Sequence, residues 1–380
     1  MTIQPWPIAR MSHSALAMKF GADRADLMQW ALTHGDPLAD KVARRIAEGD
    51  GDLATALDLG LRDGLAALDR PDPDLVALLE DVEQAASEVD DDLFDDGAEA
   101  FWTMPPAVHV ISLSVGSLAR VYVSPSIAAV LSATGRLVDG ADARLRETAK
   151  WLGEAMLPGA LRVGAPGYIA TVGVRMLPAK VRYYAAKGGY DAARYGTPIN
   201  QVDLARVWID FTLTSWQAEA ALGYTFTSHE LDRMYRLWGY IGRLLGIDPR
   251  FVSGITTHAA ARRMSELLDA VTGPLTAQSA ILAQATIESV AVQLQENTKL
   301  PVWHGRSLLR QLTYRFHGHV RASELKVPPA PLASPVIDAT TAIIRARRRR
   351  LRNAPEAWAK MTGCNLSELR KQLRALAETA

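Results

Sequence analysis

Hydrophobic residues recur at spacings of three and four along most of the chain, which is the period of a helix with one buried face. Residues 203–222 place Trp208 and Trp216 on one broad apolar face. Residues 235–245 repeat the pattern and stop before Gly246, a residue type that commonly ends helices. Alternating apolar and polar runs, which are typical of half-buried strands, are scarce. We therefore predict an all-α protein with about a dozen helices.

Prolines and glycines divide this pattern into segments. A third long helix is expected over residues 276–294, and a linker over residues 327–335, which contain four prolines. We expect an N-terminal segment over residues 1–34, a single large helical domain over residues 35–328, and a linker with basic C-terminal helices over residues 329–380.

The 42 basic and 42 acidic residues cancel, so no net field favours nucleic acid. Residues 90–96 contain five aspartates but lack the regular spacing of a calcium loop, so a solvated loop or helix end is expected there. Residues 345–352 contain six arginines, a density that could serve nucleic acid or an anionic membrane surface. No aromatic residues interleave with these arginines. We expect a solvated C-terminal helix, for which the acidic run is one candidate ion-pair partner.

Cys364 is the only cysteine, which excludes an intrachain disulfide and a cysteine-based zinc site. A reducing compartment, the cytoplasm, is the expected location. The first ten residues lack the apolar core of a signal peptide. No run of about 18 apolar residues is present, so no membrane-spanning helix is expected.

Common catalytic motifs are absent from the sequence. There is no glycine-rich phosphate loop and no G-x-S-x-G nucleophile turn. The eight histidines form no H-E-x-x-H motif, and His317 and His319 would point to different faces of a helix. His109 lies in a strongly apolar stretch, where a hydrogen-bonded core histidine is the expected role and an iron ligand is the alternative. We expect no metal site built from acidic, cysteine or histidine clusters.

Six segments, in order along the chain, carry a family resemblance. They are residues 35–40, 116–137, 144–148, 175–182, 196–203 and 237–246. Together they resemble the family of rubber oxygenases (latex clearing proteins) and MpaB-type oxygenases, over roughly residues 35–328. The resemblance implies an all-α fold with a globin-like helical core around a haem pocket, and an enzyme that uses dioxygen to cleave isoprenoid double bonds.

The resemblance also implies roles for particular positions. The family's iron-binding histidine falls in the fourth segment, where this chain has Pro178. The arginine and threonine that lie near the haem correspond to Arg144 and Thr148, and a neighbouring lysine position is Glu147. Haem iron needs a donor such as histidine, thiolate, methionine or tyrosine, and the amide nitrogen of a proline has no free lone pair. Nearby donors exist, but none is an obvious replacement: Met176, Lys180, Tyr183 and Tyr184.

We therefore expect an enzyme that acts without haem on an apolar, isoprenoid-like or polyketide-like molecule in the pocket that holds haem in relatives. Arg144, Glu147 and Thr148 would supply acid–base or electrostatic catalysis, for instance in a cyclisation or isomerisation. Glu147 would need desolvated surroundings to act as a general acid. Alternatively, Arg144 is a helix-face arginine and Thr148 a core threonine that bonds its own backbone.

Two other functions remain open at this point. The first is a haem b-dependent oxygenase with a non-standard iron ligand, in which Arg144 and Thr148 lie near the cofactor. The second is a protein that binds a ligand without catalysis. The expected partner is an apolar small molecule rather than nucleic acid, and the oligomeric state is left open.

Overall fold

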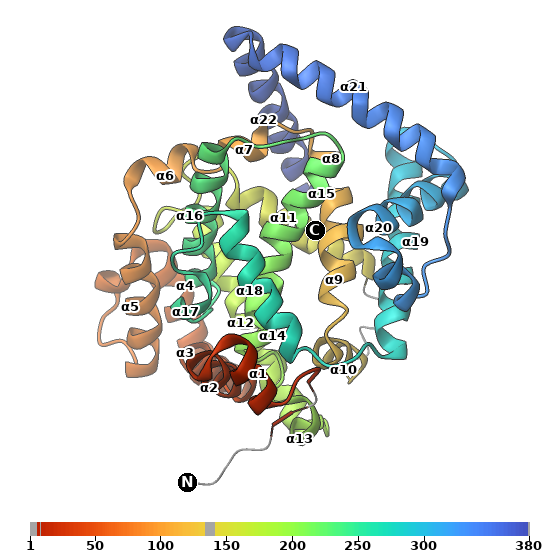
Figure 1. Cartoon of the computed structure of the whole chain (residues 1–380). Helices are drawn as coiled ribbons and strands as arrows, with labels where there is room; N and C mark the ends of the chain where they lie inside the picture. The colour runs from red at the N-terminus through yellow and green to blue at the C-terminus, as the bar shows by residue number, and fades with distance from the viewer. Residues whose placement is uncertain (1–5, 8, 134–140, 379–380) are drawn as a thin grey trace. The chain divides into compact units, whose positions relative to one another are not determined.

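The structure is a computed structural model that describes residues 6–7, 9–133 and 141–378 (Figure 1). Helices and the loops between them account for all of these residues, and none of them forms a strand. This confirms the prediction of an all-α protein. The described helices are more numerous and shorter than the dozen expected, with 22 α-helical segments. The part of the second family-like segment at residues 134–137 lies outside the described residues.

The chain folds into two compact units that interleave along the sequence. Unit 1 comprises residues 1–98, 151–206 and 232–273, and unit 2 comprises residues 99–150, 207–231 and 274–380. Three helices cross a boundary between these ranges: α11 (Ala141–Ala155), α14 (Gln201–Ile209) and α16 (Ser228–Leu244). Neither unit follows the expected domain limits at residues 34 and 328, and those limits stay a prediction.

Aspartates start many helices of unit 1, because the side chains of Asp36, Asp50 and Asp72 each accept a hydrogen bond from a backbone N–H of the first turn. The longest helix of unit 1, α12, buries a stripe at spacings of three and four, and it packs on α3. Besides the shared helices, the unit contains α1 (His13–Phe20), α2 (Ala22–Thr33), α3 (Pro37–Ala47), α4 (Gly51–Asp63), η1 (Leu65–Ala67), α5 (Pro73–Ser87), α6 (Asp91–Asp96), α12 (Pro166–Lys187), α13 (Ala192–Tyr195), α17 (Pro249–Val252) and α18 (His258–Val271).

Two long neighbouring helices, α19 and α20, organise the core of unit 2, with Val290, Leu309 and Leu325 fully buried. The unit contains α7 (Glu99–Trp102), α8 (Pro106–Ile111), η2 (Ser112–Leu118), α9 (Ala119–Val121), α10 (Pro125–Ala133), η3 (Asp210–Thr214), α15 (Ser215–Ala221), α19 (Ala277–Thr298), α20 (Val302–Glu324), η4 (Pro331–Ala333), α21 (Ser334–Arg352) and α22 (Pro355–Glu378). Here η2 and η3 are π-helical turns, and they contact each other.

The three long helices expected from the sequence are present. Residues 235–245 lie in α16 and its C-terminal end, after which Gly246 adopts a φ of 75°. The helix expected at residues 276–294 is α19, which begins with a capping box between Thr276 and Ser279. The helix expected at residues 203–222 runs through α14, η3 and α15, so its middle turn is π-helical rather than α-helical.

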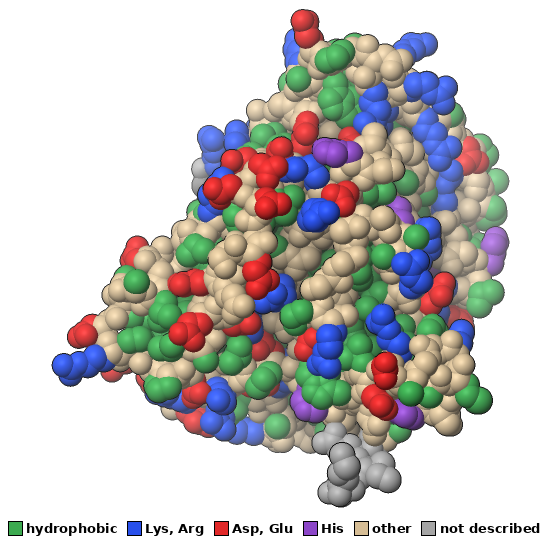
Figure 2. Space-filling model, turned by 60° about the vertical axis from the view of Figure 1, so that its left-hand side comes forward, with side chains coloured by type: hydrophobic (Ala, Val, Ile, Leu, Met, Phe, Trp, Pro, Cys, Tyr) green, Lys and Arg blue, Asp and Glu red, His purple; other side chains and the backbone are tan. Residues whose placement is uncertain are grey.

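The acidic run forms the short helix α6 and is paired within unit 1. Arg162 binds Asp91 and Asp95, while Arg233 binds Asp92 and Asp96. The expectation of a solvated helix end is confirmed. Arginines other than those of residues 345–352 therefore neutralise these four carboxylates. Figure 2 shows acidic and basic side chains interspersed over the face that it presents.

Among the described residues, no single helix is long and apolar enough to cross a bilayer. One pair of helical stretches, Pro106–Val121 and Pro125–Leu131, reaches the required length and hydropathy together but is bent by 101°.

Candidate functional site

Four of the six family-like segments meet at a buried polar hub in unit 1, formed by Asp36, Asp81, Arg175, Gln201 and Gly246. Arg175 donates from Nε to Asp36 Oδ2 at 2.6 Å and from Nη2 to Asp36 Oδ1 at 3.1 Å. Its third nitrogen donates to Asp81 Oδ2 at 2.7 Å. Burial by itself lowers the pKa of Arg175, but Asp36 and Asp81 outweigh this effect and raise the pKa above its ordinary value.

Gln201 joins the remaining segments to this hub. Its amide nitrogen donates to the carbonyl oxygens of Gly35 and Gly246, each at 2.9 Å, and its carbonyl accepts from the N–H of Asp248 at 2.9 Å. These contacts tie the buried Gln201 side chain to backbone groups of two loops, one between α2 and α3 and one between α16 and α17. The residues that carry the resemblance in unit 1 therefore serve to hold the fold.

A second ion pair lies two turns further along α12. Arg182 donates to Asp40 Oδ1 at 2.7 Å and to the Ile199 carbonyl at 2.9 Å. Burial raises the pKa of Asp40, although Arg182 opposes that effect. A side chain on Gly35 would collide with the Arg182 guanidinium. The two arginines of the fourth family-like segment thus bind the two aspartates of the first.

Pro178 lies between these arginines, half-buried on the flank of α12. The helix runs as one element from Pro166 to Lys187, so the proline is accommodated within it. Its ring removes one backbone donor, and its amide nitrogen offers no lone pair to iron. At this position the donor chemistry does not fit haem.

The substitute donors on the same helix do not converge on Pro178. Met176 is buried, whereas Lys180 and Tyr184 are exposed. The Tyr183 hydroxyl accepts a hydrogen bond from Lys187. The described groups of three or more His, Cys, Asp and Glu side chains include none that could hold a metal ion.

The three predicted catalytic residues all lie on α11. The side chain of Arg144 is outside the described part of the structure. Glu147 is exposed, and Thr148 is half-buried. Glu147 therefore lacks the desolvated surroundings that a general acid requires. The roles of Arg144, Glu147 and Thr148 stay predictions.

A buried polar cluster in unit 2 is the main site that sequence reasoning missed. It consists of His109, Ser112, Ser215 and Glu219, all of them under 6 % exposed. Glu219 Oε1 accepts from His109 Nδ1 at 2.8 Å and from Ser112 Oγ at 3.0 Å. Ser112 Oγ lies 3.1 Å from Ser215 Oγ. The cluster joins α8 and η2 to α15.

The arrangement is not that of a nucleophilic triad. His109 Nε2 lies 3.0 Å from the Phe101 carbonyl oxygen, and the imidazole stacks on the Phe101 ring. Its other nitrogen faces Glu219, so neither nitrogen is directed at Ser112 as a base. His109 is a hydrogen-bonded core histidine, as the sequence predicted, and its ring is not available to iron. Among the described residues Glu219 Oε2 has no hydrogen-bond partner.

A second buried carboxylate, Asp210, begins the π-helical turn η3. Its Oδ1 accepts from Arg120 Nε and from Thr214 Oγ1, each at 3.0 Å, and Ser117 of η2 donates to its backbone carbonyl. Asp210 and Glu219 interrupt the apolar pattern of residues 203–222. An acidic residue within such a pattern is the sequence feature that could have pointed to this buried polar cluster. A π-helical turn often marks a functional position in a helix.

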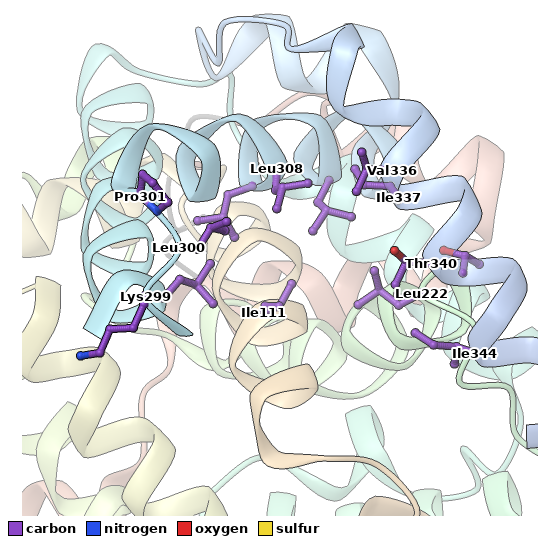
Figure 3. Close-up of a pocket in the computed structure, with 14 residues that line it drawn as sticks. Ile111, Leu222, Lys299, Leu300, Pro301, Leu308, Val336, Ile337, Thr340 and Ile344 are labelled. Carbon is purple, nitrogen blue, oxygen red and sulfur yellow. The ribbon is translucent and has the colours of Figure 1, made fainter. Parts of the chain in front are cut away.

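Unit 2 also contains an apolar cavity of about 550 Å³ (Figure 3). Eleven of its 14 lining residues are hydrophobic, including Ile111, Leu222 and Leu308. The other three are Lys299, Thr340 and Thr341. Figure 3 shows the Lys299 amine at one end, directed away from the other labelled residues. The volume lies in the range of small-molecule sites. The cavity is not lined by residues of α11 or α12.

Comparisons with known proteins agree with the resemblance. Residues 106–346 match the sequence profile of the family described as ER-bound oxygenase mpaB/B'/Rubber oxygenase, catalytic domain. A solved structure of latex clearing protein LCP in the closed state is similar in fold, with a TM-score of 0.65 and 19% sequence identity. The similarity covers 87% of this chain and 91% of that chain. No curated protein matches the chain.

Proposed function

Because this chain belongs to the mpaB and rubber oxygenase family yet has Pro178 in the helix expected to carry the iron ligand, we propose that it is an enzyme that works without haem. Its substrate is an apolar small molecule of isoprenoid or polyketide type. The reaction would be one that needs no redox cofactor, such as a cyclisation or an isomerisation. The observation that carries the substrate class is the cavity of about 550 Å³ in unit 2.

The cavity supports this substrate class by its size and its walls. Burying an apolar chain against aliphatic side chains gains about 25 cal/mol per Å² of surface removed from water. The walls supply few polar atoms, so a charged or heavily hydroxylated substrate would lose its hydration without compensation. This differs from the expectation of a substrate held in the haem pocket of relatives, because no residue of α11 or α12 lines the cavity.

A second candidate function is ligand binding without catalysis. It is favoured by one observation: Lys299 is the only ionisable side chain among the lining residues. A cavity whose lining residues include no carboxylate and no histidine suits storage or transport of an apolar molecule as well as it suits catalysis. The two functions differ in whether the bound molecule is chemically changed.

The test combines binding with turnover. The purified protein is titrated with N-phenyl-1-naphthylamine, a fluorescent apolar probe, which is then displaced with farnesol or geranylgeraniol. Leu308→Asp places a carboxylate in the half-buried cavity wall, and its probe affinity should fall at least about tenfold. Ile343→Asp, on the exposed side of α21, is the matched control and should bind the probe normally.

Each outcome decides between the candidates. Displacement together with a new product by mass spectrometry supports the enzyme. Displacement with unchanged ligand supports the binding protein. Equal probe binding by Leu308→Asp and wild type would rule out this cavity as the site.

A further inference from the structure

The outer side of α21 carries an exposed apolar stripe. Val336, Ala339, Ile343 and Ala346 recur at intervals of three and four and therefore line up along the helix. Val336 is 58% exposed and Ile343 is 69% exposed, and Leu332, just before the helix, is 93% exposed. The opposite side of α21 is the buried one, with Ile337, Thr341 and Arg348. The helix thus has apolar residues on both sides, whereas an ordinary surface helix has them on one.

The last two turns of α21 add a concentrated positive charge. Arg345, Arg347, Arg349 and Arg350 are exposed. The other two arginines of the run are used within unit 2: Arg348 donates to the Thr103 carbonyl at 2.7 Å, and Arg352 to Glu230 at 2.8 Å. The only acidic residue of α21, Asp338, binds Arg315 at 2.6 Å. Four guanidinium groups therefore remain on the surface of a helix whose own acid is already paired.

We propose that α21 is an interfacial helix that docks this protein on anionic lipid bilayers. The apolar stripe would contact the acyl-chain boundary, and the four exposed arginines would contact the lipid phosphates. A helix with Ile and Val along one line and clustered arginines matches the composition of helices that lie in the membrane surface. Nucleic acid would account for the arginines but not for the apolar stripe, and α21 carries no aromatic side chain for stacking on bases.

The same helix forms a wall of the apolar cavity. The buried side of α21 contributes Ile337, Thr341 and Ile344 to the cavity wall. Val336 also lines the cavity, and it belongs to the exposed stripe as well. An apolar molecule dissolved in the bilayer could therefore reach the cavity along α21 with little exposure to water. This delivery role rests on the proposed function. The docking surface itself does not.

The experiment is co-sedimentation with vesicles of phosphatidylcholine, with or without phosphatidylserine, in the absence of any apolar ligand. We expect the protein to pellet with phosphatidylserine vesicles only, and the bound fraction to fall as salt is raised. Ile343→Glu, and separately the replacement of Arg345, Arg347, Arg349 and Arg350 by glutamine, should each lower the apparent affinity at least about tenfold. Met18→Glu is the matched control, because Met18 is 84% exposed on α1 of unit 1, and it should bind as wild type does.

Three results would overturn the inference. They are absence of sedimentation with anionic vesicles, equal losses in Met18→Glu and Ile343→Glu, and a change from dimer to monomer in Ile343→Glu by light scattering with vesicle binding unchanged. The last result would assign the stripe to a second copy of the chain. Far-UV circular dichroism of each variant checks that α21 stays folded. Vesicle binding without probe binding would refute the proposed function alone, whereas probe binding without vesicle binding would refute only the docking surface.

Discussion

Arg175 and Asp36 form a bidentate ion pair inside unit 1, with bonds of 2.6 and 3.1 Å and both side chains under 5 % exposed. The pair joins the fourth family-like segment to the first, and it places Pro178 one turn further along the same helix. The frame of the family fold is therefore intact around a position that cannot bind iron.

Removing the cation from this pair should be costly. Arg175→Met strands the buried Asp36 carboxylate, and we expect a loss of about 3–5 kcal/mol in the free energy of unfolding, measured with urea. Adding Asp36→Leu should recover part of that loss. Arg243→Met is the control, because its partner Glu88 is 52% exposed, and it should cost below about 1 kcal/mol. Similar losses in the two single variants would contradict a buried hub.

Gly246 offers a test of close packing at the same hub. Its φ is 75°, and a side chain there would collide with Asp36 and Arg175. Gly254 has a φ of 74° but open space around it, so Gly254→Ala isolates the conformational cost, which we expect to be about 1 kcal/mol. Gly246→Ala should cost about 3 kcal/mol or more, because overpacking adds to it. Equal losses in the free energy of unfolding for Gly246→Ala and Gly254→Ala would mean that Asp36 and Arg175 can move aside to accept the added methyl group.

Stability should fall on mild acidification. Burial lowers the pKa of His258 and of His317 from 6.5 to about 4, and nearby arginines add to the effect. Between these values the unfolded chain binds more protons than the folded one, so the stabilisation is complete above about pH 6.5 and is lost as the pH approaches 4.

Urea unfolding over that pH range measures this loss. His317→Gln can still donate to the Val115 carbonyl, which His317 Nε2 contacts at 2.8 Å, but it cannot titrate, so its stability should depend less steeply on pH. His304→Gln, at an exposed position, is the control. A wild-type stability that stays constant from pH 7 to about 4 would contradict the prediction.

The predicted catalytic residues of α11 can be tested against a structural role. No residue of α11 lines the unit 2 cavity, so Arg144→Ala and Thr148→Ala should each lower turnover at least about tenfold, with little change in the urea midpoint, only if these side chains contact the substrate outside that cavity. Glu147→Gln removes the charge of the exposed Glu147 but keeps the size of its side chain, so it tests the role of the charge alone. A loss of stability as large as the loss of activity would assign Arg144 and Thr148 to packing.

Helical periodicity was enough to predict the fold class and the long helices α16 and α19. It could not show the π-helical turns, because η3 keeps the apolar pattern while shifting its register by one residue. The resemblance identified Arg175 and Gln201 by their segments but not as a hub, since their partners are more than 40 residues away in sequence. The cavity could not be predicted either, because its lining residues are spread along the sequence from Ile111 to Ile344. Spacing along one helix does not encode such distant contacts.

Pro178→His tests whether the fold can still bind haem when a histidine occupies this position. The variant restores a nitrogen donor, and we expect it to take up haem from added haemin with a new Soret band. Pro178→Ala restores only the backbone N–H and should take up none. Equal uptake by both variants would mean that the donor at this position does not decide haem binding.

We propose that the wild-type protein works without haem, and its haem content can be measured. The most direct measurement is the visible spectrum and the haem content per mole of protein, purified from cells supplied with a haem precursor. We expect a colourless protein with no Soret band, which nevertheless binds the apolar probe. A Soret band with one haem per chain would contradict it and would place this chain among the haem-dependent oxygenases of its family.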